Sequence, residues 1–382
     1  MLLAVPSCKK EDAIASTTYV AVEAAFKGAI NLNSLENYAG QTKPNYITKD
    51  NTGANQITDK GATLGRVLFY DKNLSVNNSI SCASCHSQQF AFSDTAVFSR
   101  GVNGLTGRHS MRLVNARFGA EAKFFWDERA ITLEAQTTQP IKDHLEMGFS
   151  GENGTPGISS LITKLSNINY YKELFRFVYG TEEVTEGKMQ LALAQFVRSI
   201  QSFDSKYDAG RALVPNDGAN FPNFTAQENT GKNLFLARPN FNASGVRLGG
   251  GLGCNGCHAA PEFDIDPNSR SNGMGESIAG SRDFTNTRSP SLRNLVNAVG
   301  VENGPMMHTG SLKNLSAAIG HYNNLTAAAQ SNPNLDNRLK PNGTLGQQLQ
   351  LTEQEVSAVM AFLRTLSGTD VYTNKKWSNP FP

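Results

Sequence analysis

Two short stretches of the sequence share one pattern, Cys82-Ala83-Ser84-Cys85-His86 and Cys254-Asn255-Gly256-Cys257-His258. Together they hold four of the five cysteines. A CxxCH pattern is the attachment signature of c-type haem, in which each thiol adds across a vinyl group and the following histidine becomes the proximal iron ligand. Two residues between the thiols match the separation of the two vinyl groups on one porphyrin edge. The sequence therefore predicts two covalently bound haem c groups, one ligated by His86 and one by His258.

The same cysteines leave other kinds of site open. They could form a structural zinc site or two redox-active CxxC pairs, but neither explains the histidine that follows each pair. A disulfide framework would suit an oxidising compartment, yet a chain of 382 residues can bury its own core without such cross-links. Haem attachment is the interpretation that accounts for both histidines.

The overall composition is that of an ordinary globular protein. Hydrophobic residues make up 39% of the chain and charged residues 18%, which excludes disorder for most of it. The formal net charge is only +2 and no basic run stands out, so nucleic acid is not an expected partner. The apolar runs fall far short of the roughly 18 to 20 residues that a membrane-spanning helix requires.

The fifth cysteine, Cys8, follows the apolar stretch Met1-Leu2-Leu3-Ala4-Val5 and precedes two lysines. This looks like the end of a bacterial lipoprotein signal, although the apolar part is shorter than the roughly 7 to 15 residues expected and no charged segment precedes it. The alternative is a free thiol in a floppy tail. Because bacteria attach haem covalently outside the cytoplasmic membrane, we expect a periplasmic or otherwise exported protein, with a lipid anchor on Cys8 as one option.

Helical signals dominate the rest of the chain, and strand signals are weak throughout. Apolar residues from Leu64 to Leu68 and from Met189 to Ile200 follow helical spacing. Thr132 is a candidate cap for a helix that carries Gln136, and Thr225 and Thr352 each begin a capping box. We therefore predict a mainly α fold.

The chain also divides into two similar halves. The stretch 210–224 is rich in Gly, Pro and Asn and is the best candidate for a linker. On either side, residues 57–209 and 225–382 each contain a helix, a haem motif, a long loop-rich segment and a closing helix. Two cytochrome c-like helical haem domains with long loops follow from this repeat. Residues 1–56 are expected to form a tether or a segment that wraps the surface.

Six phrases follow one another along residues 64–366. They are LGRVLFYDKNLS (64–75), CASCH (82–86), FFWDERAITLEAQTTQPIKDHLEMG (124–148), GCNGCH (253–258), RSPSLRNL (288–295) and MMHTGSLKNL (306–315). In this order they resemble the bacterial dihaem cytochrome c peroxidase family, which includes the MauG-type enzymes. The resemblance implies two mostly helical domains, with a peroxidatic haem in the first and an electron-transfer haem in the second.

For the first haem, the resemblance implies a carboxylate that carries a proton from the near to the far oxygen of peroxide, so that water leaves instead of hydroxide. This residue is Glu146, with Gln136 as its hydrogen-bonding orienter. Pro140 would shape the distal wall, and Trp126 would lie between the haems and shorten the gap for electron tunnelling. The loop 98–107 lacks the histidine that blocks the resting iron in many members, which implies an open iron.

For the second haem, the resemblance implies a sixth ligand fourteen residues after His308, at Tyr322. Many peroxidases of the family carry methionine there and MauG-type members carry tyrosine. The neighbouring His321 is the alternative, whereas Met306 and Met307 are loop residues in the family's register. A phenolate ligand favours oxidised iron and lowers the reduction potential.

Two further positions depart from the family. His109 replaces an asparagine that helps to hold an interdomain calcium ion with backbone groups at Asn303 and Pro305, and imidazole suits calcium poorly. Leu252 replaces a tryptophan that MauG uses for electron hopping.

The expected function is reduction of hydrogen peroxide to water with electrons from a small redox protein such as cytochrome c. One alternative is a MauG-like oxidase acting on a protein or small-molecule partner, which Tyr322 favours and Leu252 opposes. The other is a dihaem electron carrier without enzymatic activity. Family members are often dimers, so a homodimer is compatible with the resemblance, but no interface can be read from the sequence.

Overall fold

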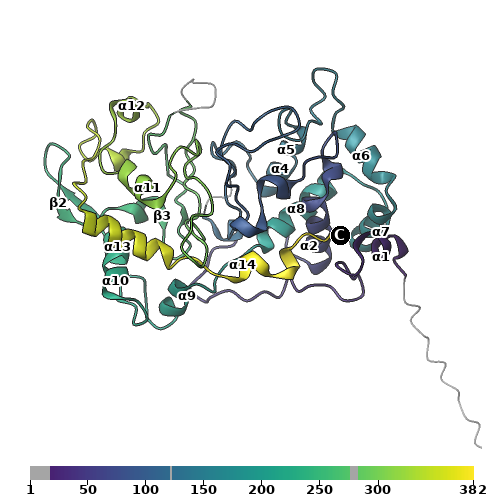
Figure 1. Cartoon of the computed structure of the whole chain (residues 1–382), viewed down its shortest axis with the longest axis horizontal. Coiled ribbons are helices and arrows are strands. Elements are labelled where there is room, and N and C mark those ends of the chain that lie inside the picture. Colours follow the sequence, from purple (N-terminus) through teal and green to yellow (C-terminus); the bar gives the residue numbers. More distant parts are fainter. Residues whose placement is uncertain (1–17, 121–122, 276–282) are drawn as a thin grey trace, which may run out of the picture.

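The computed structural model describes residues 18–120, 123–275 and 283–382. Within these ranges the chain is rich in helices and long loops, as Figure 1 shows, and the prediction of a mainly α protein with little strand is confirmed. The strands form two short antiparallel pairs. They are β1 (Pro239–Phe241) with β2 (Arg247–Gly250), and β3 (His258–Ala259) with β4 (Asp264–Ile265).

The helices are mostly short. In chain order the α-helices are α1 (Val20–Phe26), α2 (Asp59–Tyr70), α3 (Cys82–Cys85), α4 (Leu133–Thr137), α5 (Gln139–Lys142), α6 (Ile158–Ser166), α7 (Asn169–Tyr179), α8 (Glu186–Ser199), α9 (Lys206–Arg211), α10 (Ala226–Leu236), α11 (Leu315–His321), α12 (Ala327–Gln330), α13 (Glu353–Arg364) and α14 (Asp370–Thr373). The 3₁₀ helices are η1 (Lys72–Leu74), η2 (Gln88–Phe90), η3 (Ala116–Phe118), η4 (Cys254–Gly256), η5 (Asn337–Leu339) and η6 (Lys375–Trp377).

The predicted caps begin the predicted helices. The Thr132 hydroxyl accepts a hydrogen bond from the Ala135 amide at 3.1 Å and so caps α4. In α13 the Thr352 hydroxyl accepts from the Glu355 amide at 3.2 Å, and the Glu355 carboxylate accepts from the Thr352 amide at 3.0 Å. Thr225 forms the same reciprocal pair at the start of α10. Each cap satisfies amides that have no partner within the helix, which fixes where the helix begins.

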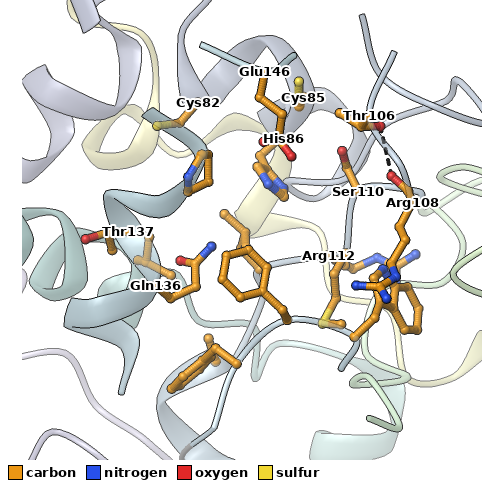
Figure 2. Close-up of a pocket in the computed structure, with 18 of the residues that line it drawn as sticks. Cys82, Cys85, His86, Thr106, Arg108, Ser110, Arg112, Gln136, Thr137 and Glu146 are labelled. Carbon is orange, nitrogen blue, oxygen red and sulfur yellow. Dashed lines mark hydrogen bonds between the residues drawn. The ribbon is translucent and has the colours of Figure 1, made fainter. Parts of the chain in front are cut away.

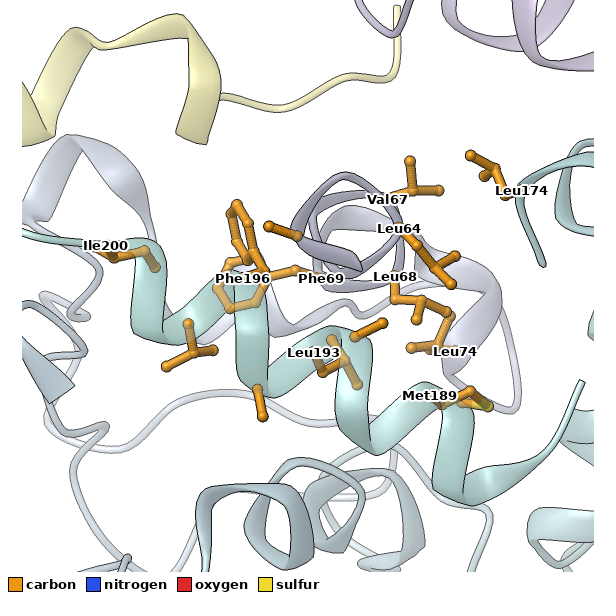
Figure 3. Packing of buried hydrophobic residues seen from close by; sticks show 14 of the residues in the cluster. Leu64, Val67, Leu68, Phe69, Leu74, Leu174, Met189, Leu193, Phe196 and Ile200 are labelled. Atoms are coloured by element: carbon orange, nitrogen blue, oxygen red, sulfur yellow. The ribbon is translucent and has the colours of Figure 1, made fainter. Parts of the chain in front are cut away.

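The core of the first half is the contact between α2 and α8, seen in Figure 3. Leu64 and Phe69 of α2 and Leu193 and Phe196 of α8 are all buried, because the helical spacing of the apolar residues gives each helix one apolar face. The helices approach closely at Gly65, where an added Cβ would lie 2.0 Å from the carbonyl oxygen of Ala192. A larger residue at this position would therefore push the two helices apart.

Buried apolar residues form two large clusters. The first extends from Val22 to Ile200, and the second extends from Tyr207 to Leu366 and contains α10 and α13. The chain then returns, because Trp377 belongs to the first cluster although the sequence places it in the second domain. Figure 1 shows the C-terminus beside α1 and α2. The division into two haem domains at 210–224 stays a prediction.

The segment before α2 packs onto the first half. The amides of Ala21 and Val22 donate to the Glu173 carboxylate of α7 at 3.1 and 2.9 Å, and Phe26 is buried. This short helix was not visible as a periodic pattern in the sequence. Cys8 lies outside the described residues, so its acylation stays a prediction. No described helix is both long enough and apolar enough to cross a bilayer.

Candidate active site

The first haem motif forms the one-turn helix α3, with Cys82 and Cys85 at its two ends. Residues three apart on a helix lie on the same face, which gives the two thiols a common direction. His86 ends the helix, and its Nδ1 atom is 3.2 Å from the carbonyl oxygen of Phe92. Since a carbonyl only accepts, Nδ1 carries the proton and Nε2 has the free lone pair that an iron ligand requires. Burial also lowers the pKa of His86, which favours this neutral form.

A cavity of about 620 Å³ opens beside this motif, within the range of roughly 300 to 1,000 Å³ that is usual for cofactor sites. The cavity is lined by every residue that was assigned to the first haem from the sequence, and Figure 2 labels several of them. These residues are Cys82, Cys85, His86, Trp126, Gln136, Pro140 and Glu146. Segments far apart in the sequence thus contribute to one space that is large enough for a cofactor.

Glu146 is half-buried and lies in the turn after α5, where its amide donates to the Asp143 carboxylate at 3.0 Å. Burial raises the pKa of Glu146 to about 7, and the negative charge of Asp143 adds to this, while Arg129 opposes it. A carboxyl with this pKa is populated in both protonation states near neutral pH. Gln136 reaches the same cavity from α4, but within the described chain the two side chains do not hydrogen-bond each other. The orienting role of Gln136 stays a prediction.

Trp126 lies where the two halves of the chain meet. Its Nε1 donates to the carbonyl oxygen of His109 at 2.8 Å, and its own carbonyl accepts from the amides of Thr287 and Arg288 at 2.9 and 3.0 Å. Its ring centroid is 6.1 Å from that of His308. The bond at Nε1 therefore holds the indole, and the two bonds to the carbonyl hold the backbone that carries it.

Arg112 is a cavity residue that the sequence analysis missed. Burial lowers the pKa of its guanidinium to about 10, which still leaves it charged at neutral pH. Its Nε atom is buried without a hydrogen-bond partner, and no carboxylate of the described residues forms an ion pair with it. An unpaired buried charge is costly, so the cavity suits a group that brings its own negative charge, as haem does through its propionates. No motif marks Arg112 in the sequence.

The second haem motif begins as η4, and His258 follows in the short strand β3. Burial lowers the pKa of His258 to about 4, against the opposing effect of the Pro290 and Phe263 carbonyls, so the imidazole is neutral as a metal ligand must be. None of the four motif cysteines is joined to another by a disulfide. The described residues contain no group of three or more His, Cys, Asp or Glu that could hold a metal ion, so the cysteines do not converge on a zinc site.

Tyr322 follows α11 and is half-buried. Its hydroxyl oxygen is 3.2 Å from the Nδ2 atom of Asn272, and burial raises its pKa, to which the thiols of Cys257 and Cys254 contribute. The Tyr322 hydroxyl thus lies near the two cysteines of the second motif. The alternative ligand, His321, already uses Nε2 in a 2.8 Å hydrogen bond to the Asn272 carbonyl.

His109 and Leu252, the two positions that depart from the family, both contact other residues of the protein. His109 is buried, and its Nδ1 donates to the carbonyl oxygen of Ala96 at 2.9 Å. Burial lowers its pKa to about 4. Leu252 is part of the second apolar cluster. The weak or absent binding of calcium between the two halves stays a prediction.

Comparison with known proteins gives consistent results. Residues 59–212 match a family model described as di-haem cytochrome c peroxidase. The chain is 30% identical over 325 residues to the methylamine utilization protein MauG of Methylorubrum extorquens, a match that covers 82% of this chain and 80% of that protein. It is 26% identical over 308 residues to the cytochrome c551 peroxidase of Nitrosomonas europaea, with 80% of each chain covered. A solved structure of a MauG-like protein associated with microbial copper homeostasis has a TM-score of 0.66 and 25% identity, and covers 89% of this chain and 99% of its own.

Proposed function

The chain belongs to the di-haem cytochrome c peroxidase family, which makes it an oxidoreductase with two haem c groups, and we propose that it reduces hydrogen peroxide to water. The electrons would come from a small redox protein such as cytochrome c. The observation that carries the proposal is Glu146, a half-buried carboxyl with a pKa of about 7 in the same cavity as the first haem motif. A protein that only carries electrons does not require a proton-transferring carboxyl beside its haem.

On this proposal Cys82 and Cys85 hold the first haem as thioethers and His86 ligates its iron. The bound haem supplies the electron-transfer chemistry at the iron. Glu146 accepts the proton of the near peroxide oxygen and returns it to the far oxygen, so that the leaving group is water. Since its pKa lies close to neutral pH, neither half of this transfer is strongly uphill. Pro140 would narrow the space above the haem, and Gln136 would hydrogen-bond the carboxyl once substrate or haem is bound.

Trp126 is proposed to carry electrons between the two halves. A hydrogen bond at Nε1 holds the indole, two bonds to the Trp126 carbonyl hold its backbone, and its ring lies close to His308. A fixed aromatic ring shortens each tunnelling step without a change in structure. For the second haem, held by Cys254, Cys257 and His258, we propose Tyr322 as the sixth ligand.

Two observations favour a MauG-like oxidase as the second candidate. One is the likeness to MauG of Methylorubrum extorquens, and the other is a tyrosine in place of methionine at position 322. Leu252, in place of the tryptophan that MauG uses, argues against the same protein-oxidising role. We also propose that the protein acts outside the cytoplasmic membrane, where bacteria attach haem c.

The test is steady-state turnover of the purified dihaem protein with hydrogen peroxide and a reduced small cytochrome c. Peroxide-dependent oxidation of the cytochrome is the expected result. Negligible turnover, together with a high-spin ferric signal in electron paramagnetic resonance, would support the oxidase instead. Two low-spin signals and no high-spin signal would support an electron carrier and would refute the peroxidase.

A further inference from the structure

A single side-chain amide lies between two atoms that could bind iron near the second haem motif. The Nδ2 atom of Asn272 is 3.2 Å from the hydroxyl oxygen of Tyr322 and 3.2 Å from the thioether sulfur of Met307. Asn272 precedes Tyr322 by 50 residues in the sequence, so no local pattern joins them. Asn272 and Met307 lie between β4 and α11, whereas Tyr322 directly follows α11.

The direction of the Asn272 amide follows from its other partners. The backbone amide of Met274 donates to the Asn272 Oδ1 atom at 3.1 Å, which makes Oδ1 the acceptor and leaves Nδ2 as the donor. The Asn272 carbonyl accepts from His321 Nε2 at 2.8 Å. Since the side chain and the backbone are both held, the amide donates to the Tyr322 oxygen.

The Tyr322 side is held as well. Its backbone carbonyl accepts from Gln347 Nε2 at 2.9 Å, and its amide donates to Ile319 at the end of α11. Met307 has a φ of 67°, a left-handed conformation that residues with side chains seldom adopt and that persists only where the surroundings impose it. The three groups therefore meet in a fixed arrangement and not in a mobile loop.

We propose that Asn272 is a positioning residue for the sixth ligand of the second haem, and that its hydrogen bond to the Tyr322 oxygen sets the reduction potential of that haem. The inference rests on the proposed role of Tyr322 as ligand. A donor on the phenolate oxygen draws electron density away from the iron, so it makes the ferric form less stable relative to the ferrous form. Asn272 thus keeps the potential of a tyrosine-ligated haem from falling too low to accept electrons.

The size of the effect follows from the strength of the bond. A hydrogen bond to a charged group contributes roughly two to three times as much as a neutral one, and part of it is lost on reduction. We expect that removing the donor shifts the oxidised-to-reduced ratio of the second haem about tenfold towards the oxidised form. For a one-electron couple this is a fall of about 59 mV.

The experiment measures the midpoint potential of each haem by spectroelectrochemistry in the holoprotein, after the mass confirms two haems. Asn272→Leu removes the donor without adding a charge, and it should lower the potential of the second haem, and only of that haem. Asn272→Asp also removes the donor but adds a negative charge beside the ligand, so it should lower the potential further than Asn272→Leu. Asn268→Leu, an exposed position in the same segment, is the matched control. An unchanged potential in Asn272→Leu, or an equal fall in Asn268→Leu, would overturn the proposal.

A second measurement needs no variant. Resonance Raman of the wild-type ferric protein should show an iron–phenolate stretching band, and exchange into D₂O should shift it, because the Asn272 amide protons are replaced. A band that does not shift overturns the role of Asn272 but leaves Tyr322 as ligand. A missing band overturns the ligand assignment, and this inference with it. Neither result depends on peroxide turnover, so failure of the peroxidase proposal is seen separately.

Discussion

Replacement of Glu146 by glutamine tests the proposed proton transfer most directly. The amide has nearly the same size and shape but cannot accept or release a proton near neutral pH. Both haems should attach as in the wild type, because the substitution leaves both CxxCH motifs unchanged and keeps the size of the side chain. The second-order rate constant for the reaction with peroxide should fall by roughly 10² or more, the usual contribution of a positioned acid or base.

The pH dependence of the wild-type rate constant tests the same role of Glu146 without any substitution. With a pKa of about 7, Glu146 is about 10% ionised at pH 6 and about 90% ionised at pH 8. The base form is the ionised one, so the wild-type rate constant should rise about tenfold across this range. A carboxyl at its ordinary value of 4.5 would be almost fully ionised at both values and would give a flat profile.

Stopped-flow absorption at the first haem, with peroxide in excess, measures both effects. Glu152→Gln is the matched control, because Glu152 is exposed in the following loop and does not line the cavity. The control should retain the wild-type rate and its pH profile, while the Glu146 variant should be slow and independent of pH from 6 to 8. A Glu146→Gln protein with an unchanged rate, or one that keeps the tenfold rise, would remove Glu146 from the mechanism.

Three further outcomes follow from the structure. Phe196→Ala, in the contact between α2 and α8, should lower the free energy of unfolding by about 3 to 5 kcal/mol, measured by urea denaturation of the holoprotein; a loss below about 1 kcal/mol would contradict the tight packing at Gly65. Thr352→Ala removes the cap of α13 and should cost about 1 kcal/mol in the same assay, while Thr352→Ser should cost less. Trp126→Phe keeps an aromatic ring but loses the hydrogen bond to His109, so rapid mixing should show slower electron transfer between the haems with an unchanged first reaction with peroxide; equal transfer rates would exclude the indole from the route.

Those parts of the fold that depend on local sequence could be predicted. The helices α4, α10 and α13 begin where a threonine supplies the first acceptor, and α2 and α8 follow the spacing of their apolar residues. Caps and spacing act over four or so residues, so they can be read without knowledge of the rest of the chain. The haem motifs could be located for the same reason, because each is defined by neighbouring residues.

Contacts between distant segments could not be predicted. Trp377 returns to the first apolar cluster, and the Tyr70 hydroxyl donates to its carbonyl at 2.6 Å, across 307 residues. Arg112 and Asn272 were missed for the same reason, because their importance lies in which groups from other segments they meet or fail to meet. The assignment of Gln136 as the partner of Glu146 came from the family, and the structure places them in one cavity without a bond.

The two haem motifs are alike, so they cannot by themselves make the two haems different. On the proposed function, the difference arises from the side chains that other segments bring to each site. At the first site a carboxyl with a pKa of about 7 comes from the turn after α5, and a carboxyl that must carry protons cannot also be tied up as a permanent ligand. At the second site α11 brings a phenol whose oxygen is already fixed by Asn272, which suits a ligand that stays in place while electrons pass. On that proposal, the loops that follow the helices, and not the CxxCH motifs, determine which haem meets peroxide and which only transfers electrons.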